Sequence, residues 1–267
     1  MTPLSQCPGD VLGAVVGVLT DIDETVSTNG RLTADAYQAM ASLQAAGLRL
    51  IPVTGRPAGW CDHIARFWPV DAVVGENGAF WMWQDRAAGK LRTRFVQGEG
   101  ERAEGRRRLE AVRAEVLREV PGAGIASDQP YRVADLAVDF CEDVPLLSPA
   151  EIDRILEIFR QHGAHAKASS IHVNGWFGDY DKLTTSREMM RELFGIDLGV
   201  ERARWVFSGD SPNDAPMFGY FPNSVGVANV RDFADGMEHL PRWVTARRSG
   251  AGFVELAEAL LAARRAT

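Results

Sequence analysis

Two aspartates stand two positions apart, directly after an apolar run, in the segment Asp21-Ile22-Asp23-Glu24-Thr25. In the turn that leaves a strand, such a pair can point into one crevice, where one carboxylate acts as a nucleophile and the other transfers a proton. A calcium-binding loop is excluded, because Val26 stands where the sharp turn requires glycine and Leu32 where a bidentate glutamate is required. An ordinary acidic turn is the alternative that this segment alone leaves open.

Three later segments carry groups that suit a phosphate and a divalent cation. In Val53-Thr54-Gly55-Arg56-Pro57, a hydroxyl, backbone N–H groups beside a glycine and the start of a helix form a phosphate cradle. Lys182 opens a later helical stretch, and two more carboxylates, Asp210 and Asp214, follow a strand. Oxygen-rich acidic clusters are what Mg²⁺ requires. Taken one at a time, these segments are also compatible with a strand-to-helix turn and a surface lysine.

The fold decides whether these segments meet. Apolar, β-rich runs alternate with helical stretches over 11–80 and again over 182–264. We expect strands at 11–20, 48–54, 71–74, 205–208 and 224–228, and helices at 33–46, 57–67, 182–194 and 253–264. This alternation predicts an α/β protein with a Rossmann-like parallel sheet, and such sheets place their sites at the carboxyl ends of the strands.

The middle of the chain, about 80–174, has a looser pattern that indicates an inserted α+β domain. It holds short strand-like pieces at 91–96, 136–140 and 170–173, and helical stretches at 101–120 and 148–162. We expect the cluster Trp81, Met82 and Trp83 to pack in a strand of this insertion. The predicted organisation is a disordered N-terminus (1–10), a core domain (11–82 and 175–267) and an inserted domain (83–174).

Composition excludes several classes of protein. The chain has 29 Lys and Arg against 36 Asp and Glu, a net charge of −7, so we expect no nucleic-acid partner. The apolar run 11–20 is about half a membrane span and follows no basic segment, so we predict no membrane partner and a cytoplasmic location. Three separate cysteines and five scattered histidines suggest no disulfide framework and no zinc site. No Gly-x-Gly-x-x-Gly follows the first strand, which excludes a dinucleotide-binding oxidoreductase.

The order of the four segments resembles the haloacid dehalogenase (HAD) superfamily of phosphohydrolases. Asp-x-Asp-x-Thr is followed by Thr-Gly-Arg 33 residues later (54 − 21), then by Lys182, then by Gly-Asp-x-x-Asn-Asp 28 residues after the lysine (210 − 182). The resemblance covers about 11–82 and 175–263. Glu24 departs from it, since many members have glycine there.

The place of the insertion, between the Thr-Gly-Arg and lysine segments, is similar to the class IIB cap group of that superfamily. That group contains Cof-type sugar phosphatases, sucrose-phosphate and trehalose-phosphate phosphatases and phosphomannomutases. The segment Gly75-Glu76-Asn77-Gly78-Ala79 is similar to one that precedes the cap in those relatives. The resemblance therefore implies that the inserted domain is a cap that selects the substrate.

The resemblance also implies roles for individual residues. Asp21 is the expected nucleophile and Asp23 the expected acid and base, while Thr54 and Lys182 complete the catalytic set. The implied cofactor is Mg²⁺, held by the Asp21 carboxylate, the Asp23 backbone carbonyl and Asp210, with Asp214 close by. The other candidates for binding phosphate or substrate are Gly55, Arg56, Asn77, Trp176 and Asn213. Trp176 and Phe177 either offer a flat apolar surface to a sugar or pack between cap and core.

The predicted function is that of a Mg²⁺-dependent phosphatase that hydrolyses a sugar phosphate or a similar small phosphorylated metabolite through an aspartyl-phosphate. Two alternatives stay open: a phosphomutase of the phosphomannomutase type, and an inactive binding module on the same fold. We expect a monomer or a homodimer.

Overall fold

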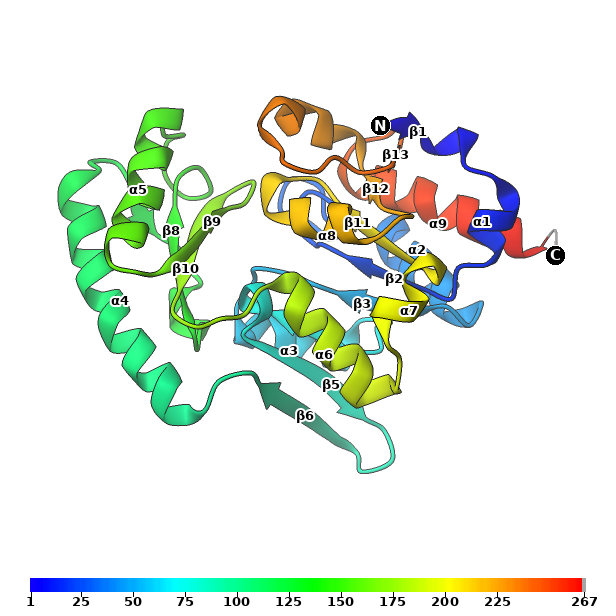
Figure 1. Ribbon diagram of the computed structural model, residues 1–267, viewed down its shortest axis with the longest axis horizontal. Helices are drawn as coiled ribbons and strands as arrows, with labels where there is room; N and C mark the ends of the chain where they lie inside the picture. The colour runs from blue at the N-terminus through cyan, green and yellow to red at the C-terminus, as the bar shows by residue number, and fades with distance from the viewer. Residues whose placement is uncertain (266–267) are drawn as a thin grey trace.

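The computed structural model describes residues 1–265, which form two lobes (Figure 1). The larger lobe contains a six-stranded sheet in the order β1-β13-β12-β11-β2-β3, and all neighbouring strands in it run parallel. Its strands are β1 (Thr2–Pro3), β2 (Gly17–Thr20), β3 (Arg49–Pro52), β11 (Trp205–Gly209), β12 (Val225–Gly226) and β13 (Trp243–Val244). The prediction of an α/β core with a Rossmann-like parallel sheet is confirmed.

Helices cover both faces of this sheet because its central strands carry buried apolar side chains on both faces. Val18 of β2 and Val206 of β11 face one cluster of buried side chains, while the next residues, Leu19 and Phe207, face another. The first cluster lies under α1 (Gly9–Gly13), α2 (Ala34–Ala45), α3 (Ala58–Phe67) and α9 (Ser249–Arg265). The second lies under α6 (Lys182–Phe194), α7 (Leu198–Glu201) and α8 (Ala215–Tyr220).

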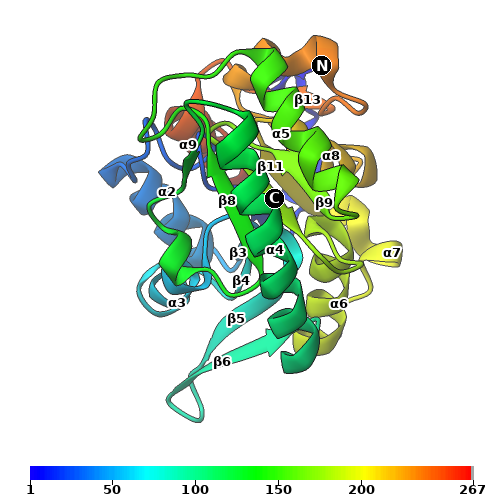
Figure 2. The same ribbon diagram turned by 90° about the vertical axis from the view of Figure 1, so that its left-hand side faces the viewer.

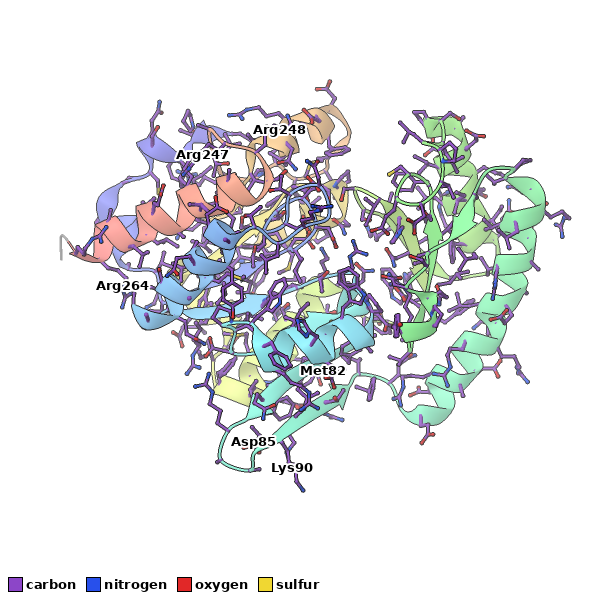
Figure 3. All side chains as sticks on the ribbon, turned by 180° about the vertical axis from the view of Figure 1, so that it is seen from behind. Met82, Asp85, Lys90, Arg247, Arg248 and Arg264 are labelled. Carbon is purple, nitrogen blue, oxygen red and sulfur yellow. The ribbon has the colours of Figure 1, made fainter. Side chains whose placement is uncertain are left out.

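A three-stranded antiparallel sheet extends the larger lobe beyond β3. It has the order β4-β5-β6, with β4 (Val73–Gly75), β5 (Phe80–Asp85) and β6 (Lys90–Phe95). Trp81 and Met82 are buried in a strand, as predicted, but this strand packs in the clusters of the larger lobe, so their assignment to the inserted domain is wrong. Lys90 and Asp85 lie at the far end of this hairpin (Figure 3).

The smaller lobe is the insertion. Its antiparallel sheet has the order β7-β8-β10-β9, with β7 (Gly124–Ile125), β8 (Asp135–Asp139), β9 (His165–Ala168) and β10 (His172–Trp176). The helices α4 (Glu99–Glu119) and α5 (Pro149–Gln161) cover the outer face of this sheet (Figure 2). Leu136, Val138 and Val173 contact these helices, so the alternate residues of β8 and β10 face the larger lobe. We call this lobe the cap.

The sequence-based domain boundaries at 82/83 and 174/175 both fall inside strands, namely β5 and β10. Both strands are tied to neighbours along their whole length, β5 to β6 and β10 to β8 and β9. A boundary inside such a ladder would separate hydrogen-bonded pairs. We therefore propose that the cap extends from the connection after β6 to the connection before α6.

The N-terminus differs from the prediction of a disordered segment at 1–10. Thr2–Pro3 pairs with Trp243–Val244, and the Thr2 N–H donates to the Arg242 carbonyl. The predicted strand 11–20 is also divided, into the end of α1 and the shorter strand β2. Leu4 and Leu12 are buried in the cluster beneath α9, and this burial holds the N-terminal segment in place.

Short 3-10 helices complete the connections, at Leu4–Gln6, Glu76–Gly78, Gln129–Tyr131, Arg202–Arg204, Pro212–Asp214 and Ala228–Gly236. Within residues 1–265, no helix combines the length and the hydropathy needed to cross a bilayer.

Candidate active site

The segments that follow β2, β3 and β11 meet at one edge of the parallel sheet. These three strands are neighbours, so their carboxyl ends lie side by side. The Asp21 N–H donates to the carbonyl oxygen of Ser208 over 2.8 Å, which joins the end of β2 to the end of β11. This bond places Asp21 beside Asp210.

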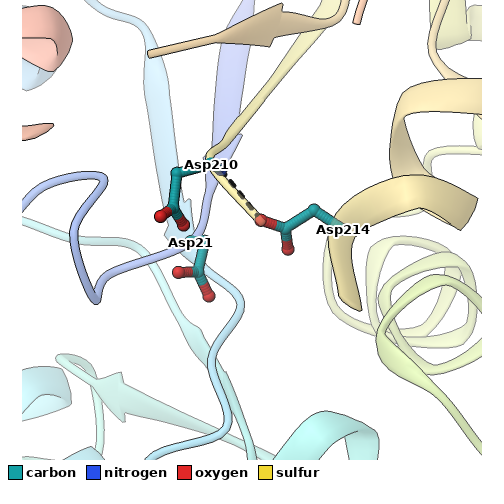
Figure 4. Close-up of side chains that lie close together, drawn as sticks. All are labelled: Asp21, Asp210 and Asp214. Atoms are coloured by element: carbon teal, nitrogen blue, oxygen red, sulfur yellow. Dashed lines mark hydrogen bonds between the residues drawn. The ribbon is translucent and has the colours of Figure 1, made fainter. Parts of the chain in front are cut away.

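Three carboxylates converge at this edge. One carboxylate oxygen from each of Asp21, Asp210 and Asp214 lies within 4.8 Å of the other two, and Figure 4 shows the three side chains together. All three are buried, at 4%, 1% and 0% exposure respectively. Oδ2 of Asp214 accepts the Asp210 N–H at 3.1 Å. Three carboxylate oxygens in one place form a hard donor set, which fits Mg²⁺.

Lys182 lies against this cluster because Asp181 caps the first turn of α6. The Asp181 carboxylate accepts the Thr184 N–H at 2.6 Å, so that the helix starts at Lys182. The Lys182 ammonium then donates to Asp21 at 2.7 Å and to Asp214 at 2.8 Å. Of the charged groups singled out from the sequence, the fold thus brings Asp21, Lys182, Asp210 and Asp214 into contact.

The electrostatics of the cluster favour a bound cation. Burial raises the pKa of Asp21 to about 7, and the neighbouring Asp214 and Asp23 add to this effect while Lys182 opposes it. Burial by itself lowers the pKa of Lys182, but Asp21 and Asp214 raise it overall, so this amine stays charged. One ammonium faces three carboxylates, and a divalent cation would offset the remaining repulsion.

Thr54, Gly55 and Asn77 stand in the connections that follow β3 and β4, and Gly55 lines the same cavity as Asp21. The Thr54 side chain is fully buried, and its hydroxyl oxygen accepts the Arg56 N–H at 3.0 Å. A side chain at Gly55 would approach Asn77 Nδ2 to 3.2 Å, so glycine lets the two loops come close together. Asn77 itself has a left-handed φ of 54° and is 3% exposed. Its Nδ2 finds no hydrogen-bond acceptor in the described part of the chain.

Arg56 joins the two lobes. Its Nε lies 2.9 and 3.0 Å from the two carboxylate oxygens of Asp23. Its terminal nitrogens lie 3.3 Å from Asp128 and 3.1 Å from Glu142, both of which belong to the cap. Arg132 of the cap also donates to the Gly55 carbonyl at 2.8 Å. In this conformation the guanidinium of Arg56 orients Asp23 and holds the cap against the larger lobe.

Glu76 makes a second connection between the lobes. Its carboxylate accepts the N–H groups of Ala58 in α3 and of Val133, Ala134 and Asp135 at the start of β8. Burial raises the pKa of Glu76 to about 8, and Asp135 adds to this effect. Sequence reasoning missed Asp128, Arg132 and Glu142, because a lone acid or base in an insertion carries no motif. It gave no role to Glu76, although Glu76 stands in the segment 75–79 that precedes the cap.

The remaining candidates have different surroundings. Asn213 is 9% exposed, accepts the Ser211 hydroxyl at 2.7 Å and lines the cavity beside Asp21. Trp176 is 2% exposed, its indole N–H donates to the Tyr180 carbonyl at 3.1 Å, and its ring stacks on Tyr180. Trp176 packs between cap and core, which is the second of its two predicted roles, and it also lines a small cavity near Lys182.

We predict that Glu142 stabilises the contact between the two lobes only above acidic pH. The hydrogen bond from His172 and the charge of Arg56 lower the pKa of Glu142 to about 2. Since its pKa in the unfolded chain is higher, its contribution is fully present above about pH 4.5 and is lost as the pH falls toward 2. Glu142→Gln should therefore cost roughly 1–2 kcal/mol of unfolding free energy at pH 6.

Urea denaturation of wild type and Glu142→Gln at pH 6 and pH 3.5 measures this difference, which should shrink at the lower pH. Glu110→Gln is the control, because Glu110 is exposed on α4. An equal difference at both pH values would contradict the assigned role of Glu142.

Comparison with solved structures identifies the fold. A Thermoplasma acidophilum protein is 17% identical over 92% of this chain and 98% of its own, with a TM-score of 0.69. The sucrose-phosphatase of Synechocystis was solved with sucrose and phosphate. It is 14% identical over 92% of this chain and 98% of its own, with a TM-score of 0.63. A HAD subclass IIB sugar phosphatase is 14% identical over the same shares, with a TM-score of 0.60.

The chain thus has the two-lobed fold of HAD superfamily structures over nearly its whole length, as the motif resemblance predicted. No protein-family model and no curated protein matches the sequence.

Proposed function

We propose that this protein is a Mg²⁺-dependent phosphatase that hydrolyses a phosphate monoester of a sugar or a similar small metabolite. The observation that carries the proposal is the buried Asp21 carboxylate, which lies 2.7 Å from Lys182 and within 4.8 Å of Asp210 and Asp214 at the carboxyl edge of the sheet. The solved structures with this fold support the same class, since two of them are named as a sucrose-phosphatase and a sugar phosphatase.

The proposed first step transfers the phosphoryl group to the protein. A carboxylate oxygen of Asp21 attacks phosphorus, the bond from phosphorus to the ester oxygen breaks, and Asp23 gives its proton to that leaving oxygen. Arg56 fixes the orientation of Asp23 through both carboxylate oxygens. Thr54 and the Gly55 N–H would hold phosphoryl oxygens, and Lys182 would offset their charge.

In the second step, Asp23 takes a proton from water, the water oxygen attacks phosphorus, and the bond to Asp21 breaks to release inorganic phosphate. Asp21, Asp210 and the Asp23 backbone carbonyl would hold Mg²⁺, with Asp214 close by. Such a cation supplies charge stabilisation for the phosphoryl oxygens as they become more negative.

Hydrolysis of p-nitrophenyl phosphate by the purified protein tests this proposal. We expect phosphate release with Mg²⁺, loss of at least about 90% of the rate with excess EDTA, and recovery when Mg²⁺ is added back, because the acidic cluster needs the cation to admit a dianion. EDTA saturated with Mg²⁺ beforehand is the control. Turnover that EDTA leaves unchanged would remove the metal from the proposal. If no phosphate monoester in a metabolite screen is hydrolysed, the proposed activity itself is wrong.

A further inference from the structure

The cap presents one face of its sheet to the edge of the larger lobe where β2, β3 and β11 end. Alternation along β10 places His172, Asn174 and Trp176 on this face, and the register adds their partners in β8 and β9. These partners include Asp135, which pairs with Trp176, and Lys167, which pairs with Asn174. Any contact from this sheet to a bound substrate comes from this face.

Most polar side chains of this face already have partners. Asp135 accepts from Arg132 and from Asn174, whose amide lies 2.9 Å away. Nε2 of His172 lies 2.8 Å from the Glu142 carboxylate. The exposed side chain of Lys167, in contrast, has no hydrogen bond or ion pair with any residue in 1–265. It is therefore a cation of the cap that is free to bind something else.

Lys167 lines a cavity of about 70 Å³ that also reaches Asn77, Lys182 and Asn213. Asn77 adds a second donor, since its buried Nδ2 has no acceptor among residues 1–265. Asp181 is the acid among the residues that line this cavity, and its Oδ1 accepts the N–H and the hydroxyl of Thr184. The free donors of Lys167 and Asn77 line this cavity, and its lining residues include two lysines against one carboxylate, so the cavity suits an anion.

The arginines near the site are not available for this task. Arg56 is bound to Asp23, Asp128 and Glu142, and Arg132 is bound to Asp128 and Asp135. The chain contains three lysines, Lys90, Lys167 and Lys182. Lys90 lies on the hairpin of the larger lobe, and Lys182 is engaged by Asp21 and Asp214. Because the protein has a net charge of −7, a substrate with an additional negative group needs a local cation such as Lys167.

We infer that Lys167 is a specificity-determining residue that binds a second anionic group, a carboxylate or a second phosphate, on the leaving group of the substrate. This inference rests on the proposed phosphatase activity. The transferred phosphoryl group would lie with Thr54, Gly55 and Lys182 on the larger lobe. Lys167 faces the same cavity from the cap and is thus directed to the remainder of the substrate.

Two matched pairs of substrates test this inference and separate the two anions. The carboxylate pair is 3-phosphoglycerate and glycerol 1-phosphate, and the phosphate pair is fructose 1,6-bisphosphate and fructose 1-phosphate. We expect the wild type to prefer the more anionic member of one pair in kcat/KM. Lys167→Gln should reduce that preference about tenfold, Lys167→Arg should retain most of it, and Lys90→Gln should leave it unchanged. The pair that responds identifies the anion.

Two results would overturn the inference. One is a wild type with no preference in either pair, and the other is a Lys167→Gln variant that loses the same factor with every substrate, p-nitrophenyl phosphate included. Binding is measured as well, as the rise in Tm that each ligand gives in Asp21→Asn protein with and without Lys167→Gln. If no substrate is turned over but a ligand still raises the Tm in a way that depends on Lys167, only the proposed function is contradicted. If substrates are turned over without any preference that depends on Lys167, only this inference is contradicted.

Discussion

Asp21→Asn is expected to reduce the hydrolysis of p-nitrophenyl phosphate by at least about a thousandfold, because an amide oxygen is a far weaker nucleophile than a carboxylate. The fold should persist, since asparagine has the same size and shape. The substitution also removes one charge from a buried acidic cluster in which the pKa of Asp21 is about 7. The metal-free variant should therefore unfold at a Tm equal to or above that of the wild type.

Initial rates with saturating Mg²⁺ and thermal unfolding followed by circular dichroism measure the two effects. Asp62→Asn is the matched control, because Asp62 lies on the surface of α3 and pairs with Arg66 outside the site. Full activity of the control together with loss in Asp21→Asn locates the effect at Asp21. A variant that is folded and turns over like the wild type would remove Asp21 from its proposed role.

The candidate site at the carboxyl edge of the sheet can be predicted from sequence because its parts follow strands that are clearly apolar. β2 and β11 are apolar at consecutive positions, which indicates burial on both faces, and polar residues follow each of them directly. Neighbouring parallel strands end at the same edge, so Asp21 and Asp210 meet there whatever the details of the helices. Lys182 is harder to place, because only the Asp181 cap and the packing of α6 direct its amine inward.

The contacts between the lobes cannot be predicted in this way. Arg56 meets Asp128 and Glu142 across separations of 72 and 86 residues, and these acids stand in turns without a periodic pattern. The same limit explains the error at Trp81. An apolar residue in a strand packs equally well in either lobe, and its pairing with Val74 of β4 decides the outcome. Such pairing depends on the tertiary structure rather than on local preference.

Lys182→Met is expected to make the stability of the protein depend on Mg²⁺. The substitution keeps the length of the side chain but removes the cation that lies 2.7 Å from Asp21 and 2.8 Å from Asp214. Loss of one partner from a buried ionic group costs about 3–5 kcal/mol of unfolding free energy. The cost should be largest near pH 8, because carboxylates whose pKa is raised in the folded state take up protons at lower pH and thereby lose their repulsion.

A divalent cation can replace the missing charge in the cluster but not the hydrogen bonds of the ammonium. In urea denaturation at pH 8, Mg²⁺ should therefore stabilise Lys182→Met by more than it stabilises the wild type, while kcat stays at least about a hundredfold below that of the wild type. Lys90→Met, on the exposed β5–β6 hairpin, serves as the control and should respond like the wild type. Equal stabilisation of all three proteins by Mg²⁺ would mean that the ammonium and the metal do not share one acidic cluster, and the proposed arrangement of nucleophile, lysine and cation would have to be abandoned.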